Sequence, residues 1–167
     1  MVISPTLPLY IAKIVDRDPE LYTGIIFSIV GISTALGAPM VARIHKISTA
    51  MLFRISLAIA AGLTVLQGIT ASILSLGILR FFFGFFNSAI TVTGNALIAR
   101  NSDKEHTGSS FGLLNGIMSL GSVMGPIIGG FLGDNIGLAY SFIGSGLIFL
   151  IAFAISMFIH EPASEHD

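Results

Sequence analysis

The chain has 167 residues, of which 53% are hydrophobic and 10% are charged, and its formal net charge is −1. A soluble domain usually carries about 25% charged residues. The low charged fraction of this chain, together with its mean hydropathy of +0.90, excludes an ordinary soluble fold. The near-neutral charge gives no indication of nucleic-acid binding, and the absence of cysteine excludes disulfides and thiolate metal sites.

Apolar segments about 20 residues long, the length that crosses a bilayer, follow one another along the chain. We expect five transmembrane helices, at residues 22–41, 50–69, 72–99, 109–133 and 137–159. Residues 1–15 are apolar but too short to span, and they lack the basic start of a signal peptide. We interpret them as the second half of a sixth helix whose start is missing. The sequence therefore predicts an all-α integral membrane half-domain over residues 1–167, ending in a tail at 160–167.

Charged residues indicate the topology. All nine acidic residues lie in the expected loops or the tail, and basic residues mark the loops after the first and third spans: Arg43, Lys46, Arg100 and Lys104. Cytoplasmic loops are enriched in Lys and Arg, so these loops are expected in the cytoplasm. The number of spans then places the C-terminus in the cytoplasm too, in a multi-pass protein of the cell membrane.

The fourth span contains an unusual density of small residues, "GSVMGPIIGG". Gly121, Gly125 and Gly129 recur every four residues and form one stripe, beside a second stripe of Ser122, Pro126 and Gly130. A membrane helix tolerates glycine and proline because no water competes for its backbone, and small residues let helices approach closely. The stripes predict either a tight packing seam or a seam with a proline bend that opens and closes.

Arg80 is the one charge deep inside an expected span. Together with Gly84, Asn87, Thr91 and Asn95 it lies on one face of the third span, and Asn115 and Ser119 give the fourth span a weaker polar face. Arginine inside a membrane usually faces a cavity or a partner. The face therefore predicts a water-lined path for substrate or ions. The alternative is that Arg80 extends to the nearer membrane surface.

Two motifs resemble those of a known family. Gly121, Gly125, Pro126, Gly129 and Gly130 fit the pattern G-x-x-x-G-P-x-x-G-G, which resembles the antiporter motif of drug:proton exporters in the major facilitator superfamily. Leu76, Arg80 and Gly84 fit L-x-x-x-R-x-x-x-G, which is similar to that family's arginine motif one helix earlier.

That resemblance implies one six-helix half of a twelve-helix transporter. The loop segment "GAPMVARIHKIS" lacks the aspartate of the family's first-half loop motif, so we favour the second half.

The resemblance also implies a proton-coupled exporter of drugs or other small amphipathic molecules. Exporters of the family usually carry protons on an intramembrane Asp or Glu, and no expected span contains one, so we expect the other half to supply that carboxylate. Two alternatives stay open: a membrane scaffold without transport activity, and a transporter built from two copies of this chain. We expect the bilayer and the other half as partners, no cofactor, no bound metal and no enzymatic activity.

Overall fold

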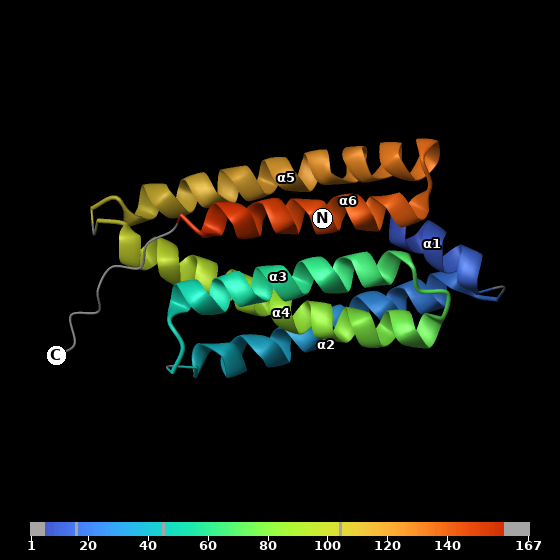
Figure 1. The fold of residues 1–167 in the computed structure, drawn as a ribbon, viewed down its shortest axis with the longest axis horizontal. Helices are drawn as coiled ribbons and strands as arrows, with labels where there is room; N and C mark the ends of the chain where they lie inside the picture. Colours follow the sequence, from blue (N-terminus) through green and yellow to red (C-terminus); the bar gives the residue numbers. More distant parts are fainter. Residues whose placement is uncertain (1–5, 16, 45, 104, 159–167) are drawn as a thin grey trace.

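The computed structural model describes residues 6–15, 17–44, 46–103 and 105–158, and this part of the chain is helical without any strand (Figure 1). Six helices follow in order: α1 (Thr6–Ile14), α2 (Pro19–Ala42), α3 (Thr49–Gly68), α4 (Ile73–Asn101), α5 (Thr107–Asn135) and α6 (Leu138–Ser156). The long helices run roughly parallel or antiparallel to one another, as Figure 1 shows.

Helices α2 to α6 are each long and apolar enough to cross a membrane, so the chain is a multi-pass membrane protein. Their bounds differ from the expected spans by at most three residues at either end. Helix α1 has nine residues, or about 14 Å of helix, which is less than half of a bilayer core. The tail at 160–167, as well as Lys104, lies outside the described residues. That residues 1–167 form one half-domain stays a prediction.

Local signals at the helix ends explain where the helices begin. Pro19 opens α2, where its missing N–H is not needed. The Ser48 hydroxyl accepts a hydrogen bond from the backbone N–H of Met51 at 3.1 Å, which caps α3. Gly137 has a φ of 123°, a conformation that only glycine adopts readily, and this allows a short reversal from α5 into α6.

Glycines and serines bring the central helices close together. A Cβ on Gly84 would lie 2.8 Å from the Val30 carbonyl oxygen of α2. On the other side of the bundle, a Cβ on Gly146 of α6 would lie 2.5 Å from the Val65 side chain of α3. Close approach of backbones is the usual way in which membrane helices associate, because burial of apolar surface gives no advantage in lipid. The pairs α2–α4, α3–α4 and α3–α6 form the body of the bundle.

Helix α1 packs at one end of this body, against α2 and α6. Its Leu7 and Ile11 join a buried cluster with Ile26, Leu76 and Phe142. The Tyr10 hydroxyl donates to the carbonyl of Thr70 at 2.6 Å, with the Gly68 carbonyl as a second acceptor at 3.2 Å. The short helix is therefore attached both by apolar packing and by hydrogen bonds to the end of α3.

Helix α5 lies along one edge of the bundle, next to α6 (Figure 1). Gly125 and Gly129 are its buried residues in the described structure. The Ser141 hydroxyl of α6 donates to the Gly129 carbonyl at 3.0 Å. Most of the α5 surface is therefore uncovered by the rest of the chain.

Candidate functional site

Arg80 lies inside the bundle, with a side chain only 6% exposed. Helix α4 places it one turn after the buried Leu76 and one turn before Gly84, on the side that faces the other helices. Its Cζ atom is 5.9 Å from the ring centroid of Phe83 and 5.9 Å from that of Phe142 on α6. Both rings are thus close enough for a cation–π attraction, which is stronger away from water.

Hydrogen bonding of the Arg80 guanidinium is incomplete. Its Nε and Nη2 atoms are buried and have no hydrogen-bond partner in the described part of the chain. The described acidic side chains lie in loops or in the end turns of helices. A buried charge without a partner is costly, so this guanidinium requires an acceptor or a counter-charge.

The residues expected to share a polar face with Arg80 divide between the interior and the surface. Gly84 is buried, and its carbonyl accepts a hydrogen bond from the Thr34 hydroxyl at 3.2 Å. Asn87 is half-buried, whereas Thr91 and Asn95 are exposed. The buried side of α4 changes along its length: Arg80 and Gly84 turn inward in its first half, whereas Thr93 and Leu97 do so later. That Thr91 and Asn95 line a path for substrate or ions stays a prediction.

The polar pair on α5 lies on its uncovered surface. Asn115 and Ser119 are both exposed, and the Ser119 hydroxyl donates to the Asn115 carbonyl at 2.8 Å. Arg80, by contrast, is buried inside the bundle.

The glycine stripes of α5 are only partly used for packing within this chain. Gly125 and Gly129 are buried against the bundle, while Pro126 and Gly130 beside them are half-buried. Gly121 is exposed, and a Cβ added there would meet no atom within 4 Å. The seam therefore contacts this chain at two of its glycines and leaves its first position open.

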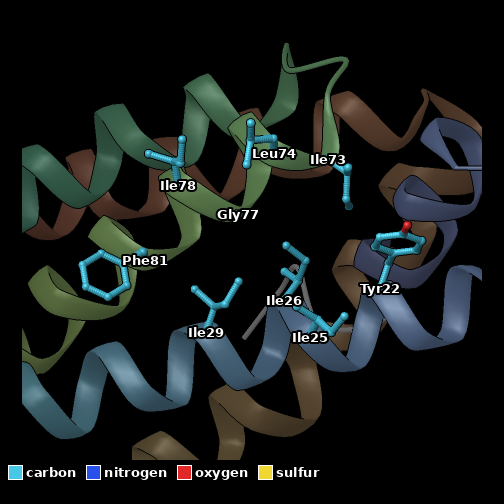
Figure 2. A pocket seen from close by; sticks show the side chains of 9 residues that line it. All are labelled: Tyr22, Ile25, Ile26, Ile29, Ile73, Leu74, Gly77, Ile78 and Phe81. Carbon is cyan, nitrogen blue, oxygen red and sulfur yellow. The ribbon is translucent and has the colours of Figure 1, made fainter.

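An apolar groove of about 420 Å³ lies between α2 and α4 (Figure 2). Figure 2 shows the side chains of Ile26 and Ile29 on α2 extending toward α4, and the groove is lined from α4 by Gly77, Ile78 and Phe81. The volume of the groove is within the range of ligand sites. Among the side chains that line it, only that of Tyr22 carries a polar atom, its hydroxyl oxygen. It suits an apolar group.

Sequence reasoning missed Gln67, which lies inside the expected span at 50–69 and is fully buried on α3. Its neighbours on one helical face, Ala60 and Thr64, are also fully buried. The small residues at this spacing were the signal that Gln67 continues a packed face of α3. In the described residues no group of three His, Cys, Asp or Glu side chains could hold a metal ion.

Comparison with known proteins gives a consistent answer over the whole chain. The family model described as Major Facilitator Superfamily matches residues 1–167. The multidrug resistance protein MdtG of Proteus mirabilis (strain HI4320) is 33% identical over 99% of this chain and 43% of its own length. The multi-drug resistance efflux pump PmrA homolog of Lactococcus lactis subsp. lactis (strain IL1403) is 30% identical over 96% of this chain and 40% of its own. The chain thus spans about two-fifths of the length of these relatives.

Proposed function

Because this chain belongs to the Major Facilitator Superfamily, we propose that it forms one six-helix half of a secondary active transporter that exports small amphipathic molecules in exchange for protons. The names of the relatives, multidrug resistance protein and efflux pump, support export of such molecules. Transport would proceed by alternating access, in which two halves rock against each other around a central site. The loop at 37–48 has no aspartate, which favours the second half.

The buried cation Arg80 carries this proposal. An arginine enclosed by apolar helices and rings is expensive in a membrane and usually serves an ion or substrate path. The inner turns of the described spans hold no carboxylate, so the proton carrier belongs to the other half. Arg80 then acts as the fixed positive charge that favours the ionised carboxylate and so releases its proton.

Two surfaces of this half support the remaining roles. The open side of α5, with Asn115, Ser119 and Gly121, is the region that the other half would cover. The groove between α2 and α4 would hold the apolar part of an amphipathic substrate. In the cell membrane, the loops that contain Arg43 and Arg100 and the C-terminus would face the cytoplasm, as their basic residues indicate.

The test is transport of a fluorescent cationic dye by the complete protein, reconstituted in vesicles under an imposed pH gradient. Arg80→Ala should abolish pH-driven dye movement while the protein still inserts, because the variant removes a charge from the membrane. Arg80→Lys keeps the charge but loses the planar fork, so partial activity is expected. Arg100→Ala, at the exposed end of the same helix, is the matched control and should transport normally. Wild-type rates in Arg80→Ala would refute the proposed role.

A further inference from the structure

One aromatic ring contacts Arg80 from a different helix. Phe142 of α6 is fully buried, and the Arg80 Cζ atom lies 5.9 Å from the centroid of its ring. Phe83, the other ring at this distance, follows Arg80 closely on α4 and therefore moves with it. A contact between two helices, unlike a contact within one helix, fixes where the cation lies relative to the rest of the bundle. Phe142 provides such a contact.

The Phe142 ring is itself held in place from two further helices. The Tyr10 ring of α1 lies 5.0 Å from it, at an interplanar angle of 58°. The Tyr10 hydroxyl is in turn bound to the backbone carbonyls of Gly68 and Thr70 at the end of α3. A Cβ on Gly68 would lie 2.9 Å from the Phe142 Cβ, so a glycine there lets α6 come this close to α3. The position of the ring is therefore set by packing within this chain.

An aromatic ring attracts a cation without accepting a conventional hydrogen bond. The face of the ring carries partial negative charge, and the attraction strengthens where water is excluded. Arg80 accordingly lies near two rings, while its Nε and Nη2 atoms have no hydrogen-bond partner in the described structure. These N–H groups belong to the planar fork with which arginine binds a carboxylate. The rings thus offset part of the cost of the buried charge and leave this fork open.

The charged side chains of the neighbouring helices lie near helix ends. Lys13 and Asp134 are in the last turns of α1 and α5, Glu20 is in the first turn of α2, and Arg54 is in the second turn of α3. Helix α6 carries no charged residue. Among the described residues, Arg80 is therefore held by aromatic rings rather than by a counter-charge.

We propose that the Phe142 ring holds the Arg80 guanidinium in register with α6 while no carboxylate is bound to it, which makes Phe142 a positioning residue for proton exchange. The assignment rests on the proposed function for its consequence in transport. Without the attraction of this ring, the guanidinium would turn toward other acceptors. The carboxylate of the other half would then meet a displaced partner, and misplacement of a reacting group slows its reaction strongly.

Fluorinated phenylalanines in place of Phe142 test the role of the ring while keeping its shape. Phe142→Leu would also leave a cavity, whereas fluorine mainly withdraws negative charge from the face of the ring. The complete protein is reconstituted in vesicles with phenylalanine, difluorophenylalanine or trifluorophenylalanine at this position. Transport of the cationic dye under a pH gradient should fall stepwise along the series, by at least about fivefold for the trifluorinated ring.

Phe149, two turns later on α6, is the matched control. Its ring packs edge-on against that of Phe83, with the centroids 5.9 Å apart. A trifluorinated ring in place of Phe149 should leave transport at the wild-type rate. A wild-type rate with the trifluorinated ring in place of Phe142 would overturn the positioning role. Equal losses at the two positions would overturn it too, because they would reflect fluorination in general.

Fluorine NMR of the same proteins tests the contact without reference to transport. The resonance of the trifluorinated ring in place of Phe142 should shift when Arg80→Met removes the charge, because fluorine responds to the local electric field. The resonance of the ring in place of Phe149 should not shift. An unchanged resonance at Phe142 would overturn the contact. If the wild-type protein moves no dye, the proposed function fails, and the NMR comparison still decides the contact.

Discussion

Gly84→Ala is the change for which the structure gives the clearest expectation. The added Cβ would lie 2.8 Å from the Val30 carbonyl oxygen and 3.2 Å from the Val30 Cα, both backbone atoms that cannot rotate away. Helix α4 must therefore move away from α2, and the hydrogen bond from Thr34 to the Gly84 carbonyl, 3.2 Å long, is weakened. Overpacking of this kind costs about 1–3 kcal/mol.

Gly77→Ala on the same helix is the matched control. A Cβ there would lie 3.5 Å from the nearest atom, a terminal methyl of Ile26, which is ordinary contact. Both variants gain the same helix preference of about 1 kcal/mol, so the difference between them isolates the cost of close packing. For a complete protein of the length of these relatives, a difference of about 2 kcal/mol corresponds to roughly 2–3 °C in Tm.

The assay is the fraction of complete protein that elutes as a monodisperse peak after heating in detergent, over a series of temperatures. Gly84→Ala should lose half of this peak at a temperature roughly 2–3 °C below that of Gly77→Ala. Equal midpoints for the two variants would refute the reasoning that α2 and α4 are in backbone contact at Gly84.

Three further expectations concern the outer parts of the bundle. Gly125→Leu should destabilise the protein by about 1–3 kcal/mol in the same heating assay, because Gly125 is buried against the bundle. Gly121→Leu should cost less, because no atom lies within 4 Å of a Cβ added there. Equal losses would contradict the reasoning that the glycine stripe packs at Gly125 but not at Gly121. Arg54→Met should increase amide hydrogen exchange in the last turn of α6, since the Arg54 Nε donates to the Ser156 carbonyl there at 3.1 Å, and unchanged exchange would exclude that capping role. In the cysteine-free background of this chain, a membrane-impermeant maleimide should label Ile69→Cys but not Arg43→Cys in intact cells, and the reverse pattern would invert the topology.

Most of the secondary structure was determined by the sequence itself. Apolar segments of bilayer length must be helical, because only a helix satisfies its own backbone hydrogen bonds in lipid. The five long helices accordingly begin and end within three residues of the expected bounds. Local residues such as Pro19, Ser48 and Gly137 then set individual helix ends.

The tertiary structure alone decided which polar residues meet. The 3.6-residue repeat of an α-helix places four polar residues on one face of a straight helix: Arg80, Asn87, Thr91 and Asn95. This repeat does not determine where neighbouring helices cross that face. Because the buried side of α4 shifts from Arg80 and Gly84 to Thr93 and Leu97 along the helix, Arg80 is buried while Thr91 and Asn95 are exposed. Gln67 was missed for the same physical reason. Its burial depends on the register between α3 and α4, which is set by close contacts such as that of Phe53 with Gly94. The sequence of a single helix holds no information about that register.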